Sequence, residues 1–153
     1  MRLAIVMAAV LALGTASASA EELEHGEKVF KQCLACHAVG ENAKNKIGPV
    51  LNGVFGRTAG TLPDFKYSKA MMDAGAGGLV WSEKVLFEYL HKPNAYVKGT
   101  KMAFAGIKSD EDIKDLIAYL LTFSPDYVPA KREGHEAADD AEGADGSEET
   151  GGK

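Results

Sequence analysis

The segment Cys33-Leu34-Ala35-Cys36-His37 constrains the fold and the chemistry of this chain more than any other feature. Two cysteines separated by two residues and followed directly by histidine form the attachment signature of a c-type haem. One turn of helix sets the two thiols where each can add to a haem vinyl group, and the histidine can offer an imidazole nitrogen to the iron. The sequence therefore predicts one covalently bound haem c, held by Cys33 and Cys36, with His37 as an iron ligand.

Two other uses of a cysteine pair fit the sequence less well. A thioredoxin-like redox pair lies near a βαβ pattern, and no such pattern flanks this pair. Half of a zinc site needs a second pair of ligands at metal spacing, and Cys33 and Cys36 are the only two cysteines in the chain. Haem attachment is therefore the favoured interpretation.

Residues Met1 to Ala20 have the organisation of a secretory signal peptide. Arg2 supplies the positive charge, Leu3 to Leu13 form an apolar run, and Ala18-Ser19-Ala20 is a small-residue cleavage site. The apolar run is too short to span a bilayer, which disfavours a retained membrane anchor. We expect a mature chain that starts near Glu21, has no membrane span and resides in the periplasm.

The rest of the chain divides by composition into one domain and an acidic tail. Residues 21–125 contain thirteen acidic and thirteen basic residues, so nucleic acid is not an expected partner. Residues 126–153 contain nine acidic and three basic residues, with no aromatic residue after Tyr127. A segment of this composition buries too little apolar surface to offset the entropy of ordering, so we expect a disordered tail.

Four segments of the domain have helical signals. They are residues 23–32, residues 67–74, a helix that begins at the N-cap Ser82 and ends near Lys92, and a helix that begins at the N-cap Ser109 and ends before Ser124-Pro125. No segment alternates as a strand does. Residues 38–60 form a long, glycine-punctuated loop that could wrap a cofactor. The predicted fold class is all-α, with three to five helices and long loops around the haem.

The iron needs a second axial ligand, and the residue types alone leave several candidates open. The candidates are Met71, Met72, Met102, His25, His91 and His135. Met71 and Met72 lie in a predicted helix, where methionine usually fills a core. Met102 lies between two predicted helices in a loop without periodicity, from which it can fold over the open face of the haem. Thioether ligation is one of several known options, so chemistry alone does not decide.

The chain resembles the class I cytochromes c, the soluble group that contains mitochondrial cytochrome c and its periplasmic bacterial relatives. The resemblance covers nearly all of residues 21–124. It rests on Gly26 and Phe30, Cys33-Leu34-Ala35-Cys36-His37, Ile47-Gly48-Pro49, Phe55-Gly56-Arg57, Phe65-Lys66-Tyr67, Trp81, Glu88-Tyr89-Leu90, Gly99 to Gly106 and Leu116 to Leu120.

This resemblance implies a class I cytochrome c fold with His37 and Met102 as the axial ligands. It implies that the Pro49 carbonyl accepts the ring N–H of His37 and so fixes the imidazole. It places Arg57, Tyr67 and Trp81 at the haem propionates, and Tyr89 and Thr100 beside Met102. It also implies that Gly26 and Phe30 pack against Leu116 and Tyr119.

The chain departs from the family pattern in three places. Met71 stands where relatives often have an asparagine near the haem, which alters the polar surroundings of Met102. Lys98 replaces the proline that usually precedes Gly99, and residues 74–78 are a few residues longer than usual. None of these departures removes a ligand.

We expect from the resemblance that the protein is an electron carrier and not an enzyme. Ligation by histidine and methionine fills both axial positions and raises the reduction potential. The resemblance places a set of lysines around the exposed haem edge as a docking surface: Lys28, Lys46, Lys98, Lys101 and Lys108. The implied donor is a cytochrome bc complex. The implied acceptor is a terminal oxidase, a photosynthetic reaction centre or a periplasmic reductase, met by a monomer in transient encounters.

Two other classes of protein remain as alternatives at this stage. A haem enzyme or gas sensor needs an iron position that opens easily, so this class requires Met102 to be a weak ligand. A dithiol oxidoreductase needs Cys33 and Cys36 to be free.

Overall fold

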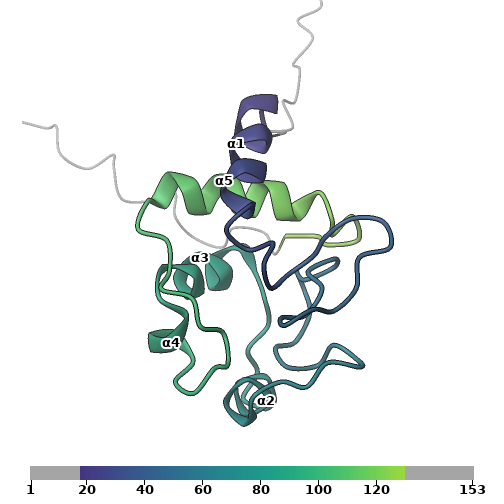
Figure 1. Cartoon of the computed structure of the whole chain (residues 1–153), viewed down its shortest axis with the longest axis vertical. Helices are drawn as coiled ribbons and strands as arrows, with labels where there is room; N and C mark the ends of the chain where they lie inside the picture. The colour runs from purple at the N-terminus through teal and green to yellow at the C-terminus, as the bar shows by residue number, and fades with distance from the viewer. Residues whose placement is uncertain (1–17, 130–153) are drawn as a thin grey trace, which may run out of the picture.

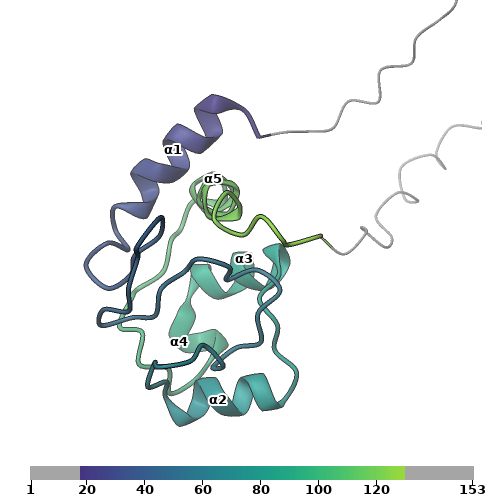
Figure 2. The ribbon, with the colours of Figure 1, turned by 90° about the vertical axis from the view of Figure 1, so that its right-hand side faces the viewer.

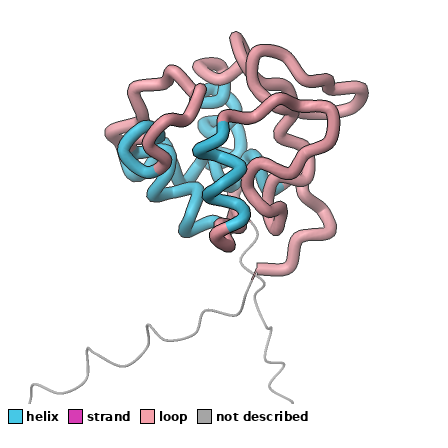
Figure 3. Tube along the Cα trace, turned by 90° about the horizontal axis from the view of Figure 1, so that it is seen from below, coloured by secondary structure: helices cyan, strands magenta, loops and turns pink. Residues whose placement is uncertain are grey.

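The computed structural model describes residues 18–129 as a helical domain with long loops. Its helices are α1 (Ala20–Phe30), α2 (Lys69–Ala76), α3 (Glu83–His91), α4 (Pro93–Tyr96) and α5 (Asp110–Leu121). Helix α5 runs across the domain, α1 crosses it, α3 packs below it, and α2 lies at the far end (Figures 1 and 2). Within these residues Figure 3 shows no strand, and the only β-like pairing is an isolated bridge between Thr58 and Val80.

Helix α1 begins earlier and ends earlier than the predicted span 23–32. Ser19 caps its start: the Ser19 side chain accepts a hydrogen bond from the N–H of Glu22, and the Glu22 carboxylate accepts one from the N–H of Ser19. Its end tightens into i→i−3 bonds, including the N–H of Cys33 to the carbonyl of Phe30 at 2.8 Å. The tightened turn delivers the chain directly into the cysteine pair.

Helices α1 and α5 cross at Gly26. A Cβ atom on Gly26 would overlap the backbone oxygen of Asp115 and lie 2.8 Å from the Cβ of Tyr119, so only glycine permits this approach. One turn further along α1, the ring of Phe30 packs 5.6 Å from that of Tyr119. Leu116, at 1% exposure, completes this side of the core. The expected packing of the first and last helices is therefore present.

A polar bridge fastens the same pair of helices at the surface. His25 Nδ1 lies 2.6 Å from a carboxylate oxygen of Asp115, and His25 Nε2 lies 3.5 Å from a carboxylate oxygen of Asp112. The hydrogen bond with Asp115 raises the pKa of His25, and the charges of Asp115, Asp112 and Glu111 act in the same direction against a smaller desolvation effect.

This bridge should make thermal stability depend on pH through His25. Because the folded-state pKa is raised, the bridge stabilises the fold at pH values below the unfolded-state pKa of about 6.5, and this stabilisation is lost as the pH rises through the folded-state pKa. We expect the Tm of the unsubstituted protein to fall, relative to that of His25→Gln, as the pH rises above about 6.5 and through the raised folded-state pKa of His25. Parallel Tm profiles for the two proteins would show that the bridge contributes nothing.

Two of the three helices between Tyr67 and Tyr96, α2 and α4, differ from the sequence-based predictions. Helix α2 begins two residues later than expected, because the hydroxyl of Ser68 caps the N–H of Met71 at 3.1 Å. It continues through Gly75, where a Cβ would overlap the backbone oxygen of Ala59. Helix α4 was not predicted, because Pro93 reads as a stop signal; here it occupies the first turn of a new helix, where its missing N–H costs nothing.

The helices of residues 18–129 are all too short or too polar to cross a membrane. The sequence-based predictions for residues 1–17 and 130–153 lie outside the described residues.

Candidate haem site

The cysteine pair lies on a compact turn directly after α1. The carbonyl of Cys33 accepts hydrogen bonds from the N–H of Cys36 at 3.0 Å and from that of His37 at 2.8 Å. Both cysteines are partly buried and unpaired, and His37 is buried. The turn thus holds two thiols and an imidazole within five consecutive residues.

The imidazole of His37 is fixed by the loop that follows. Its Nδ1 lies 2.7 Å from the carbonyl oxygen of Pro49, so Nδ1 carries the proton and Nε2 keeps its lone pair. A Cβ on Gly48 would lie 2.5 to 2.8 Å from three ring atoms of His37, so glycine is required for the ring to approach this backbone so closely. Burial lowers the pKa of His37, opposed by the bond to Pro49, and the nearby charge of Lys46 lowers it further. The imidazole is therefore neutral near neutral pH.

The thiol of Cys33 is poorly suited to redox exchange. Burial, with a smaller effect of the neighbouring Cys36, raises its pKa to about 11. Reactive dithiols depend on a thiolate with a lowered pKa. The local environment therefore argues against a dithiol oxidoreductase.

Met102 is held by two side chains that sequence resemblance had associated with it. The hydroxyl of Tyr89, on α3, donates to the Met102 sulfur at 3.3 Å. The hydroxyl of Thr100 accepts the N–H of Met102 at 3.2 Å. Burial raises the pKa of Tyr89, so the phenol keeps its proton and remains a donor. One sulfur lone pair is engaged in this way, and another is free for a metal.

Arg57 lies close to both Tyr67 and Trp81, and Trp81 in turn contacts Tyr89. The guanidinium of Arg57 donates to the carbonyls of Val50 and Asn52, both at 3.3 Å. Its carbonyl accepts the N–H of Trp81 at 3.0 Å. Burial lowers the pKa of Arg57 and raises that of Tyr67, and each group partly offsets the shift of the other, as expected for neighbours. The Trp81 ring in turn packs edge-on against Tyr89, with the centroids 5.0 Å apart.

The lysines assigned to docking are exposed, but their surroundings differ. Lys28, on α1, pairs with Glu24 at 2.8 Å. Lys46 and Lys101 reach backbone carbonyls of the segments that surround the site.

Asparagines that sequence reasoning did not single out organise the loop after His37. The Asn52 side chain exchanges two hydrogen bonds with the backbone of Gly40, at 2.9 and 2.8 Å. The Asn45 side chain accepts the N–H of Val50 at 2.9 Å, next to Pro49. Asparagine is common in loops for this reason, but the sequence gives no signal for which loop segments these two side chains join.

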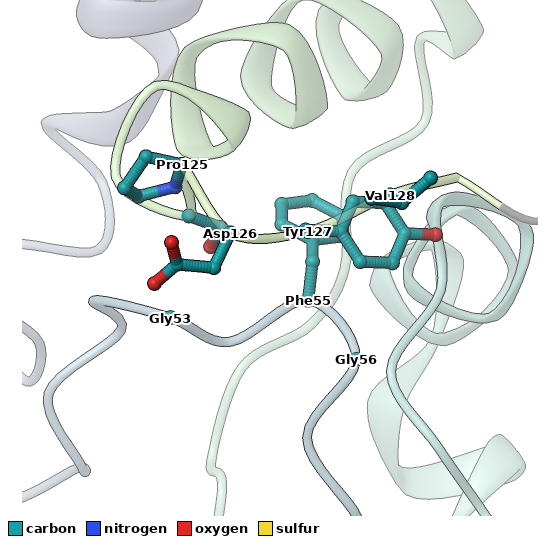
Figure 4. A pocket seen from close by; sticks show the side chains of 8 residues that line it. Gly53, Phe55, Gly56, Pro125, Asp126, Tyr127 and Val128 are labelled. Atoms are coloured by element: carbon teal, nitrogen blue, oxygen red, sulfur yellow. The ribbon is translucent and has the colours of Figure 1, made fainter.

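Two surface hollows lie away from the cysteine pair, His37 and Met102. One, of about 480 Å³, lies between residues 53–56 and residues 124–128 (Figure 4). There the ring of Tyr127 packs 5.3 Å from that of Phe55, so the chain contacts the domain beyond Pro125. The other, of about 280 Å³, lies between α3 and α5.

The donors described above suit an iron porphyrin better than a bare metal ion. In residues 18–129, no group of three or more histidine, cysteine, aspartate or glutamate side chains could hold a metal ion. Two thiols one turn apart, a neutral imidazole and a thioether form a donor set that fits a covalently attached haem. The fold and the site together thus define an all-α, c-type haem protein.

Comparison with known proteins agrees with this class. The family model for cytochrome c matches residues 23–124. The cytochrome c2 of Afifella marina is 61% identical over 104 residues, which cover 68% of this chain and 84% of that protein. The cytochrome c2 of Blastochloris viridis is 50% identical over 117 residues, covering 76% and 90%. The structure of cytochrome c2 from Rhodospirillum centenum superposes with a TM-score of 0.65 at 42% identity, covering 67% of this chain and 98% of that one.

The chain belongs to the cytochrome c family. It carries one covalently bound haem c and acts as an electron carrier rather than an enzyme. The predicted all-α, class I cytochrome c fold is confirmed.

Proposed function

We propose that the protein is a periplasmic carrier that moves one electron at a time between larger redox complexes. The donor is a cytochrome bc complex, and the acceptor is a terminal oxidase, a photosynthetic reaction centre or a periplasmic reductase. The likeness to bacterial cytochromes c2 supports this proposal. The signal-like composition of residues 1–20 supports export with cleavage after Ala20. The carrier acts as a monomer.

In this proposal Cys33 and Cys36 would hold the haem through thioether bonds, and His37 and Met102 would ligate its iron. The observation that carries the assignment is the pair of fixed donors: His37 oriented by the Pro49 carbonyl, and the Met102 sulfur oriented by the Tyr89 hydroxyl. Each donor is held by a hydrogen bond that leaves one lone pair for the iron. Arg57, Tyr67 and Trp81 hold the haem propionates, and Thr100 supports Met102.

Haem c supplies an iron that is stable in both the ferric and the ferrous form. The chain supplies two ligands that change little between these forms, because Pro49 and Tyr89 fix them in advance. Burial of His37, Trp81 and Tyr89 keeps water away from the ligands, which limits solvent reorganisation when the electron moves.

A haem enzyme or gas sensor fits this geometry less well. Such proteins need an iron position that external ligands reach easily. The Tyr89 hydroxyl and the Thr100 hydroxyl both fasten Met102 in place. Fast and tight binding of carbon monoxide to the reduced protein would favour that second class.

Electrostatic docking is the part of the proposal that association kinetics can test. The exposed lysines of the docking surface would attract an anionic partner, and the interface would be small, below about 1,200 Å². The field of these lysines reaches about 8 Å at physiological ionic strength, so the association rate should fall steeply as salt increases.

At low salt we expect Lys98→Glu to slow association with an anionic partner by roughly threefold or more relative to Lys84→Glu. Lys84 is exposed on α3 and outside the docking surface, and the two substitutions change the net charge equally. Stopped-flow kinetics over a range of salt concentrations measures both effects. Equal rates for the two variants would mean that these lysines form no docking surface.

A further inference from the structure

Two lysines at the edges of the haem site bind backbone carbonyls of the segments around it. The ammonium of Lys46 donates to the carbonyl of Leu34, between the two haem cysteines, at 2.9 Å. The ammonium of Lys101 lies 3.3 Å from the carbonyl of Tyr67 and 3.5 Å from that of Lys66. Both side chains are exposed, and each ammonium nevertheless lies within hydrogen-bond distance of a backbone carbonyl.

Lys101 fastens a stretch of chain that has few other attachments. Within the described structure, residues 101–106 take part in no backbone–backbone hydrogen bond; the nearest ones are formed by Thr100 and Ile107. The remaining hydrogen bonds of this stretch come from side chains: Tyr89 and Thr100 to Met102, and Lys101 to residues 66 and 67. Lys101 therefore supplies the polar link from residues 101–106, the methionine loop, to the segment that precedes α2.

Lys46 plays the same role for the segment that contains His37: it joins that segment to the loop that follows. The cysteine turn, residues 33–37, follows the end of α1. One backbone hydrogen bond joins it to the next loop, from the N–H of Gly48 to the carbonyl of Cys36 at 2.8 Å. The ring of His37 adds a second link, to the carbonyl of Pro49, and the bond from Lys46 to Leu34 is a third link between the same two segments. A hydrogen bond with a charged donor is stronger than a neutral one, although exposure to solvent weakens it.

We propose that Lys46 and Lys101 are positioning residues, whose ammonium groups hold the cysteine turn and the methionine loop in place. This role rests on the ligands assigned above and is separate from partner docking. Removing one ammonium frees its carbonyl acceptor and lets the attached segment move away from the site. The chain offers a matched neighbour for each: Lys98 for Lys101 and Lys44 for Lys46. Both neighbours are exposed, and within residues 18–129 neither forms a side-chain hydrogen bond or an ion pair.

The methionine loop is tested by titrating the isolated ferric holoprotein with imidazole, which competes for the Met102 position. We expect Lys101→Met to bind imidazole about fivefold more tightly than Lys98→Met. Both variants lose one positive charge, so a general electrostatic effect cancels. Lys101→Arg, which keeps a charged donor, should return the affinity close to that of the unsubstituted protein. Equal affinities for Lys101→Met and Lys98→Met would overturn the proposal for Lys101.

Met102→Ala in the same titration distinguishes failure of the ligand assignment from failure of the positioning role of Lys101. If Met102→Ala leaves imidazole affinity unchanged, the ligand assignment fails. If Met102→Ala raises the affinity and Lys101→Met does not, only the positioning role fails. No partner protein is present, so failure of the docking surface affects neither result.

The cysteine turn is tested by thermal unfolding of the holoprotein. We expect Lys46→Met to lower the Tm by about 4 °C relative to Lys44→Met, and Lys46→Arg to restore most of this loss. Rescue by arginine separates the carbonyl bond from the packing of the lysine stem. If Lys46→Met and Lys44→Met melt together, or if arginine gives no rescue, the role of Lys46 is wrong.

Discussion

Met102→Ala is expected to lower the reduction potential by on the order of 0.1 to 0.3 V, a fraction of the roughly 0.8 V that axial ligands span. A thioether stabilises ferrous iron, so its loss favours the ferric form. The substitution also removes the side chain that blocks the sixth position. Imidazole, cyanide and carbon monoxide should therefore bind more tightly than to the unsubstituted protein.

Met72→Ala is the matched control for this experiment. Met72 lies on α2 and is 48% exposed, so its loss should leave the potential and ligand binding nearly unchanged. Proton NMR of the reduced protein gives an independent reading, because a ligating methionine methyl is strongly shifted by the haem ring current. Should that signal persist in Met102→Ala, the assignment is wrong and Met71 or Met72 becomes the candidate.

Gly26→Ala is expected to destabilise the fold more than any other single-methyl addition on α1. In an open helix this change would stabilise by about 1 kcal/mol. Here the new methyl group would overlap the carbonyl oxygen of Asp115, which belongs to the α5 backbone and cannot rotate away. We expect a loss of about 3 kcal/mol or more and a fall in Tm of the order of 10 °C.

Gly77→Ala provides the control for backbone entropy. Gly77 ends α2 with a φ of −78°, and a Cβ there would meet no atom closer than 3.4 Å. This variant should melt within a few degrees of the unsubstituted protein. If Gly26→Ala melts as high as Gly77→Ala, the helices do not cross as closely as described.

The parts of the fold that local sequence rules could predict are those governed by neighbouring residues. Ser82 and Ser109 cap α3 and α5, because each hydroxyl accepts the N–H three residues later, at 3.2 and 3.1 Å. Such a cap depends only on residues close in the sequence, so the sequence alone predicts it. The haem attachment motif is equally local, since five consecutive residues carry the chemistry. Resemblance then supplied the bond between His37 and Pro49, which no local rule indicates.

The parts that could not be predicted depend on contacts between distant segments. Gly48 reads as a turn residue, and only the structure shows that its missing side chain makes room for the His37 ring. Gly75 reads as a helix end, yet α2 continues through it, and its missing side chain makes room for the backbone of Ala59. Composition placed Tyr127 in the acidic tail, but a single aromatic residue is enough to attach that stretch to Phe55. A truncation meant to remove only the acidic segment should therefore retain Tyr127.

The most direct test of the central claim is a spectroelectrochemical titration of the exported, mature protein. A carrier with one covalent haem predicts a single reversible transition that follows the haem absorption, with a slope of about 59 mV per tenfold change in the ratio of oxidised to reduced protein. The same haem should remain with the polypeptide after denaturation, because the Cys33 and Cys36 thioethers do not dissociate. A two-electron slope of about 30 mV without a haem spectrum would instead identify a cysteine dithiol couple and contradict the account.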